Sequence, residues 1–161
     1  MLRFERVVSP ADRMADVRTD DGLTLPYVLR ERSRQRVMLD SGLEAGLFLP
    51  RGTVLADGDV IVSDDGTAVL VRAQEEPLSE CRIADPLALA KACFYLGNRH
   101  VQLEIAEGRI RYIYDPVVDD MLRGMGHEVH SLMAPFHPET GAYHMPIIEV
   151  NQNGLLAGNR Q

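Results

Sequence analysis

The first half of the chain alternates short apolar segments with glycine-containing turns. No stretch there sustains the apolar period of about 3.6 residues that marks a helix. Turn sequences such as Asp57-Gly58 and Asp64-Asp65-Gly66 interrupt the apolar segments every few residues. The pattern predicts an all-β domain over residues 1–76, whose strands include the apolar segments 37–39, 47–49, 60–62 and 68–71.

The second half contains two helix starts of the same kind. Asp85-Pro86 and Asp115-Pro116 each place an aspartate cap before a proline at the first helical position. The first predicted helix ends at Gly97 and carries apolar residues at helical spacing, namely Leu87, Ala90 and Phe94. The second predicted helix ends at Gly124 and Gly126, and we expect a buried stripe of Val117, Val118, Met121, Leu122 and Met125.

Strand patterns surround these two helices. Residues 101–105 and 109–114 alternate apolar and polar side chains on either side of a Gly108 turn, which is typical of a hairpin. Strands over 78–83 and 128–134 complete the order β-α-β-β-α-β, the ferredoxin-like unit. The sequence therefore predicts two small domains, all-β over 1–76 and ferredoxin-like α+β over 77–147, with a flexible tail over 148–161.

Composition narrows the function classes. The 161 residues are 45% apolar and 25% charged, as in ordinary soluble globular proteins. A net charge of −7 argues against general binding to nucleic acid or to an anionic membrane. Two cysteines, Cys81 and Cys93, are too few for a disulfide framework. No apolar segment has the length of a membrane span or the form of a secretion signal, so we expect a cytoplasmic protein.

All five histidines lie in the second half of the chain. His100 follows the first predicted helix, where it is either a surface histidine or a metal ligand. His127 and His130 are three residues apart, and an odd separation places them on opposite faces of a strand. His137 and His144 lie in a segment that contains proline and glycine near the chain end.

Arginines occupy every second position from Arg30 to Arg36. In an extended strand Arg30, Arg32, Arg34 and Arg36 would form one basic stripe, which is either a solvated face or a site for an acidic partner or phosphate. No nucleotide-binding, nucleophile-elbow or zinc-protease motif occurs in the chain. The sequence therefore gives no positive support for an enzyme.

Two long segments resemble a known family. The first runs from Arg30 to Gly52 and includes DSGLEAGLFLPRG; the second begins with YLGNRH at residues 95–100 and ends with PFHPETGAY at residues 135–143. Together they cover about residues 22–144 in matching order. On these segments the chain resembles the urease accessory protein UreE family of nickel metallochaperones.

The resemblance implies a fold, a site and partners. It implies an N-terminal domain similar to the peptide-binding domain of Hsp40 chaperones, followed by a ferredoxin-like metal-binding domain that forms homodimers. His100 from both subunits would bind one Ni²⁺, and Zn²⁺ or Cu²⁺ would be alternative ions in vitro. The implied function is non-enzymatic delivery of Ni²⁺ for urease metallocentre assembly. The implied partners are the other urease accessory proteins, among them the GTPase, and the urease apoprotein.

The chain departs from the family pattern in two places. Some members carry Tyr-His-His-Asp-His after the hairpin, where this chain has Tyr112-Ile113-Tyr114-Asp115-Pro116. Others end in a polyhistidine tail, which this chain lacks, so that His144 is the best remaining candidate for a tail ligand. The alternative hypothesis is a protein-binding chaperone or adaptor, in which the β domain binds its partner through the Arg30–Arg36 stripe and metal binding is incidental.

Overall fold

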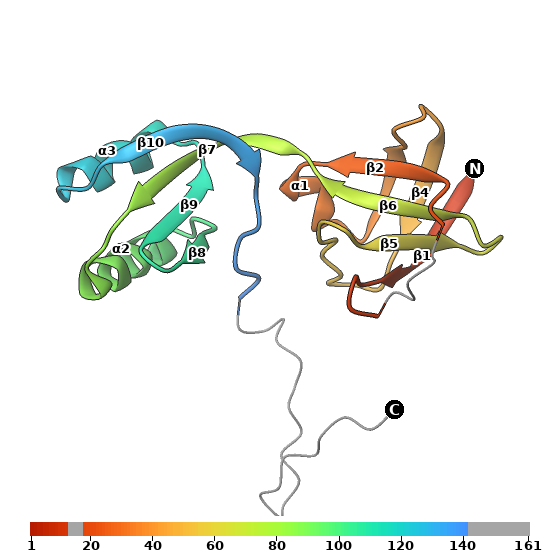
Figure 1. Cartoon of the computed structure of the whole chain (residues 1–161), viewed down its shortest axis with the longest axis horizontal. Coiled ribbons are helices and arrows are strands. Elements are labelled where there is room, and N and C mark those ends of the chain that lie inside the picture. The colour runs from red at the N-terminus through yellow and green to blue at the C-terminus, as the bar shows by residue number, and fades with distance from the viewer. Residues whose placement is uncertain (13–17, 142–161) are drawn as a thin grey trace, which may run out of the picture.

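The chain forms two β-sheets joined by one continuous ribbon (Figure 1). The computed structural model describes residues 1–12 and 18–141. The first sheet has six strands in the order β2-β6-β5-β1-β4-β3, and the second has four in the order β10-β7-β9-β8. Only Gln74 separates the end of β6 from the start of β7, so the chain passes directly from one sheet into the other. The prediction of two β-rich domains is confirmed.

The first domain is a six-stranded sheet with one short helix. The β-rich character predicted from the glycine turns is confirmed, although the pattern did not indicate the first two strands or the helix. Its core is formed by apolar side chains from all six strands, among them Phe4, Leu23 and Leu47, which are fully buried. The elements are β1 (Leu2–Val8), β2 (Asp21–Leu25), α1 (Tyr27–Arg30), β3 (Arg34–Met38), β4 (Glu44–Phe48), β5 (Val60–Ser63) and β6 (Ala68–Ala73).

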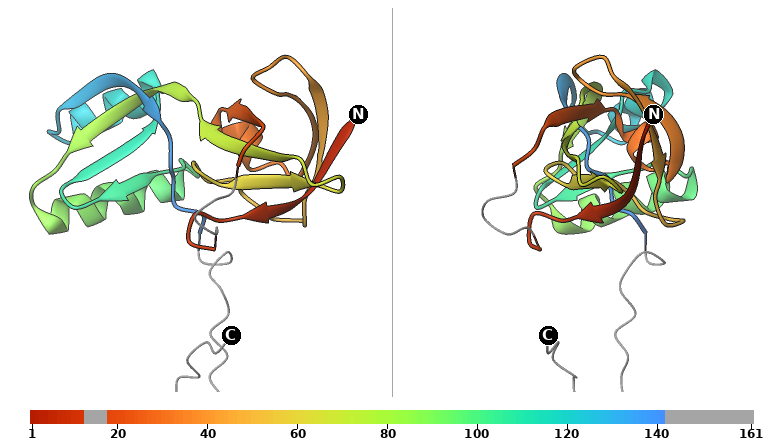
Figure 2. Two further views of the ribbon diagram at one scale, coloured as in Figure 1. Left: turned by 45° about the vertical axis from the view of Figure 1, so that its right-hand side comes forward. Right: turned by 90° about the vertical axis from the view of Figure 1, so that its right-hand side faces the viewer.

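The second domain has the predicted element order. Its neighbouring strands are all antiparallel. Both longer helices pack on one face of the sheet against Cys81, Ile110 and Tyr112, and α2 lies along that side in the turned views (Figure 2). The elements are β7 (Glu75–Arg82), α2 (Pro86–Asn98), β8 (Glu104–Ala106), β9 (Arg109–Ile113), α3 (Pro116–Gly124) and β10 (Val129–Pro135).

Both helix starts form as the sequence predicts. The Asp85 carboxylate accepts the backbone N–H of Ala88 at 3.0 Å, and Asp115 accepts that of Val117 at 2.8 Å. These bonds satisfy N–H groups that have no partner within the helix. No helix in the described ranges is long and apolar enough to cross a membrane.

The predicted buried stripe of α3 is wrong at its two ends. Val117 is 61% exposed and Met125 is 36% exposed, whereas Val118 and Leu122 are buried and Met121 is half-buried. Consecutive residues of a helix point about 100° apart around its axis, so only one side of the nine-residue α3 can contact the sheet. Val117 therefore points away from the sheet that its neighbour Val118 contacts.

The first and second domains meet in a small apolar cluster. The ring of Tyr27 packs edge-on against Phe136, with 5.6 Å between ring centroids, and Leu78 completes the cluster. Arg30 is 2% exposed, and its guanidinium donates to the carbonyl of Leu55 at 3.1 Å and to the carbonyl of Phe136. The cluster therefore ties the last described segment of the chain to α1.

The predicted basic stripe from Arg30 to Arg36 does not form. Arg30 belongs to α1 and is buried, and Arg32 lies in the turn that follows. The strand begins at Arg34, so only Arg34 and Arg36 share an extended face. The predicted domain boundary and tail stay predictions: β7 begins at Glu75, and residues 148–161 lie outside the described residues.

Candidate metal centre

His100 lies at the point where α2 ends and the chain turns toward β8. Its N–H donates to the carbonyl of Gly97 at 2.9 Å, and the next N–H, of Val101, donates to the carbonyl of Leu96 at 3.1 Å. This pair of bonds is the Schellman ending of a helix, in which one residue adopts the left-handed conformation. That residue is His100, with φ of 57°.

The left-handed backbone makes His100 unusual. No other non-glycine residue in the described ranges has a positive φ, whereas seven glycines do. Glycine is the common residue at this helix position because it lacks the Cβ that crowds the backbone there. A histidine held in this conformation costs about 1–2 kcal/mol. Such strain tends to occur at functional sites, and it points to a role for the imidazole, which is solvent-exposed.

The side chain of His100 borders a shallow hollow of about 340 Å³. The hollow lies between the end of α2 and the segment that joins β9 to α3, which contributes Ile113, Tyr114 and Asp115. These three residues present an apolar side chain, a phenol and the carboxylate that caps α3. The histidines of the Tyr-His-His-Asp-His version of this segment would stand at Ile113, Tyr114 and Pro116.

A buried hydrogen bond joins β9 to α3, on either side of the segment that contributes Ile113 to Asp115. The hydroxyl of Tyr112, at the end of β9, donates to a carboxylate oxygen of Asp119 in α3 at 2.7 Å. Tyr112 is fully buried and Asp119 is 2% exposed. Burial, together with the neighbouring carboxylate, raises the pKa of Tyr112 well above its usual value, so the phenol stays protonated and remains a donor. The bond holds β9 and α3 on either side of the turn that faces His100.

The other histidines of the described chain are dispersed. His127 precedes β10, His130 lies on its exposed face 3.7 Å from Glu128, and His137 follows it. Nowhere in residues 1–12 and 18–141 do three histidine, cysteine or acidic side chains gather at one point. Burial raises the pKa of both thiols, which disfavours the thiolate form that binds metal. His144 lies outside the described residues.

The helix that ends next to His100, α2, carries exposed apolar side chains. Leu87, Ala90 and Phe94 have the helical spacing noted in the sequence, but they point away from the sheet: Leu87 is 63% exposed and Phe94 is 64% exposed. Tyr95 is 48% exposed and packs edge-on against Phe94. The sheet is contacted by the opposite face of the helix. The helix therefore has two apolar faces, and exposed apolar stripes of this kind mark interaction surfaces.

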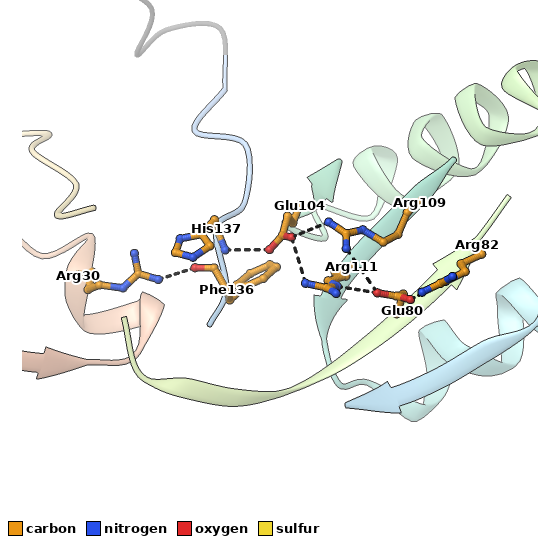
Figure 3. Close-up of polar contacts among 8 residues, drawn as sticks. All are labelled: Arg30, Glu80, Arg82, Glu104, Arg109, Arg111, Phe136 and His137. Carbon is orange, nitrogen blue, oxygen red and sulfur yellow. Dashed lines mark hydrogen bonds and ion pairs between the residues drawn. The ribbon is translucent and has the colours of Figure 1, made fainter. Parts of the chain in front are cut away.

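The open face of the second sheet carries an ionic network (Figure 3). Glu80 lies between arginines, 2.8 Å from Arg82 and 2.8 Å from Arg111. Burial works against ionisation of Glu80, but the hydrogen bonds and positive charges of these arginines prevail and hold its pKa below the usual value. Glu104 of β8 joins the network through Arg109 at 3.3 Å.

The same network positions the chain that follows β10. A carboxylate oxygen of Glu104 accepts the backbone N–H of His137 at 3.1 Å (Figure 3), and the N–H of Glu139 donates to the carbonyl of Leu103 at 2.7 Å. The last described segment therefore lies beside the start of β8. Leu103 is three residues from His100 along the chain.

Comparison with protein families shows that both domains match models of a urease accessory protein. Residues 4–74 match the UreE urease accessory protein, N-terminal domain, and residues 76–153 match its C-terminal domain. The chain therefore belongs to the UreE family. It is an accessory protein of urease maturation and not an enzyme.

Individual relatives agree with this assignment. A urease accessory protein UreE from Alkalilimnicola ehrlichii is 54% identical over 124 residues, which are 77% of this chain and 76% of that protein. The protein of the same name from Escherichia coli O157:H7 is 48% identical over 139 residues, 86% of each chain. That of Proteus mirabilis is 44% identical over 146 residues, 89% of this chain and 91% of the relative.

Proposed function

We propose that the protein is a nickel metallochaperone that binds one Ni²⁺ between two subunits and delivers it for urease metallocentre assembly. The observation that carries the proposal is the conformation of His100, an exposed imidazole held in the left-handed region at the end of α2. A backbone that favours glycine but carries histidine indicates that the imidazole is needed there.

A dimer supplies what one chain lacks. A single imidazole is a weak nickel site, but a two-fold axis passing near His100 brings two of them to one ion. The exposed apolar stripe of Leu87, Ala90 and Phe94 lies on the same helix as His100 and is suited to contact its copy. Ni²⁺ accepts imidazole nitrogen, and two imidazoles leave coordination positions open.

An incomplete ligand shell suits a carrier, because the ion must pass to a partner. We propose that His144 supplies a further ligand from the tail. His144 is five positions after Glu139, whose N–H is bonded to the carbonyl of Leu103 just before β8, so an extended chain spans about 17 Å from there. The recipients in this proposal are the other urease accessory proteins, including the GTPase, and the urease apoprotein. The proposed location is the cytoplasm.

The finer fold assignment is also a proposal. The strand order β10-β7-β9-β8, with every pair antiparallel and both helices on one face, supports a ferredoxin-like second domain. The likeness of the first domain to the peptide-binding domain of Hsp40 chaperones rests on the family resemblance.

Nickel calorimetry on matched histidine variants tests the proposal. His100→Ala should abolish tight binding, whereas His130→Ala removes another exposed imidazole, from β10, and should leave binding unchanged. Affinity should fall as the pH is lowered from 8 to 5, because protons compete with the metal for imidazole nitrogen. Tight binding that survives His100→Ala, or that is independent of pH, would exclude His100 as the ligand.

A further inference from the structure

The free edge of the first sheet combines unpaired backbone groups with unpaired arginines. β3 is the last strand in the order β2-β6-β5-β1-β4-β3 and pairs with β4 alone. We call its outer side the β3 edge, defined by Arg34, Arg36 and Met38 together with Arg51 and Phe48 beside them. We propose that the β3 edge binds an acidic, extended segment of a partner protein by adding it as a seventh strand.

The hydrogen-bond phase of β3 shows which backbone groups are free. The N–H of Leu39 donates to the carbonyl of Leu43 at 2.9 Å, and the N–H of Leu49 donates to the carbonyl of Ser33 at 2.8 Å. In an antiparallel pair such bonds involve every second residue. Residues 33, 35, 37 and 39 therefore face β4, and the N–H and C=O groups of residues 34, 36 and 38 point outward.

The β3 edge is uncovered from Arg34 to Met38 and is closed just beyond it. Asp40, two residues past the end of β3, meets the other edge strand, β2: its N–H donates to the carbonyl of Gly22 at 2.9 Å, and its carboxylate accepts the N–H of Thr24 at 3.0 Å. Within the described ranges, no comparable bond reaches the outward groups of Arg34, Arg36 or Met38, all three of which are exposed. An uncovered edge strand is a template for another strand.

The side chains at the β3 edge select the charge of the added strand. Arg34 and Arg51 border a hollow of about 620 Å³ with Phe48 and Pro50, and Glu5 is the one acidic residue on its lining. Glu5 is already paired with Arg3 at 3.3 Å. Arg34, Arg36 and Arg51 form no ion pair within the described chain, which carries a net charge of −7 overall. A local positive surface on an acidic protein is complementary to an acidic ligand.

The ligand is a polypeptide and not a nucleic acid, because the edge offers alternating donors and acceptors. A peptide strand matches both kinds of group, whereas a phosphate backbone accepts hydrogen bonds but donates none. One face of the half-buried Phe48 ring is covered by the guanidinium of Arg3, 4.1 Å from the ring centroid. The remaining apolar lining of the hollow, at Phe48 and Pro50, can take an apolar side chain next to the acidic ones. This inference concerns the first domain and is independent of the nickel proposal.

Fluorescence anisotropy with the full-length protein tests strand addition. The probe is a labelled ten-residue peptide with glutamate at alternate positions and valine or threonine between them. Two control peptides replace every glutamate by glutamine or the central valine by proline, which removes a backbone donor. We expect the acidic peptide to bind, with affinity falling as salt is raised. We expect both control peptides to bind at least tenfold more weakly.

Variants of the protein separate charge from strand pairing. The double change Arg34→Gln and Arg36→Gln should weaken binding about tenfold, while Arg123→Gln, a loss of charge from α3, should not. Met38→Pro removes an N–H that points away from β4 and forms no hydrogen bond within the sheet. This variant keeps both arginines and should still bind the acidic peptide several-fold more weakly. Circular dichroism checks that each variant is folded.

Three outcomes would overturn the proposal. Equal weakening by Arg123→Gln would show that only the overall charge matters. Undiminished binding of the proline peptide, or of the acidic peptide to Met38→Pro, would show that no strand is added. A single-stranded oligonucleotide that displaces the acidic peptide at lower concentration than an unlabelled copy of that peptide would assign the edge to nucleic acid.

Discussion

Replacing His100 by glycine should make the protein more stable and unable to hold nickel. The left-handed backbone costs an L-residue about 1–2 kcal/mol, and glycine avoids that strain. Glycine loses more backbone freedom on folding, which offsets about 0.5–1 kcal/mol of the gain. At the middle of these two ranges the net expectation is a stabilisation of about 0.75 kcal/mol in each chain. For a protein of this size, that corresponds to a rise in Tm of about 1–4 °C.

The matched control is His100→Ala, which removes the imidazole but retains the strain. Its metal-free stability should lie within about 0.5 kcal/mol of the original protein. Urea unfolding in the presence of a chelator measures both variants, at one fixed protomer concentration, because the stability of a dimer depends on concentration. Nickel calorimetry then follows on the same samples. A glycine variant that is less stable than the original would show that the left-handed conformation does not strain His100. One that still binds nickel tightly would exclude His100 as the ligand.

Three further predictions concern the second domain. Tyr112→Phe should lower the free energy of unfolding by about 1–3 kcal/mol, measured by urea, because buried Asp119 loses its donor. The double change Ile113→His and Tyr114→His should add a second, weaker nickel ion in calorimetry, because both positions line the hollow beside His100. The lowered pKa of Glu80 contributes stability that is present above about pH 4.5 and is lost as the pH falls through the folded-state value. The free energy of unfolding of the Glu80→Gln variant, measured by urea at a series of pH values, should therefore fall less steeply than that of the original protein as the pH is lowered below about 4.5.

Elements with a local signal could be predicted from the sequence. The two Asp-Pro starts predicted α2 and α3, because an N-cap depends on the residues next to it. The glycine turns predicted the β-rich first domain. By contrast, the sequence did not indicate β1, which pairs in parallel with β4 more than 40 residues later. Such pairing depends on contacts that no local pattern encodes.

The site could be predicted only in outline. His100 is a candidate because it follows a predicted helix. Its left-handed conformation could not be predicted, because a glycine usually marks this position at the end of a helix and here the residue is histidine. The apolar spacing of Leu87 and Phe94 was visible, yet the spacing does not say which face of a helix meets the sheet. Arg30 fits the alternating pattern of arginines but is buried. Its guanidinium donates a hydrogen bond to the carbonyl of Phe136, 106 residues later, and no local pattern indicates so distant a partner.

The proposed nickel site consists of one ion shared by two copies of His100. Native mass spectrometry of the full-length protein during nickel titration tests it most directly, because it counts chains and ions in the same particle. We expect a dimer that carries one tightly bound Ni²⁺, and a His100→Ala protein that carries none at the same nickel concentration. Single chains that each hold one ion, unchanged by His100→Ala, would contradict it.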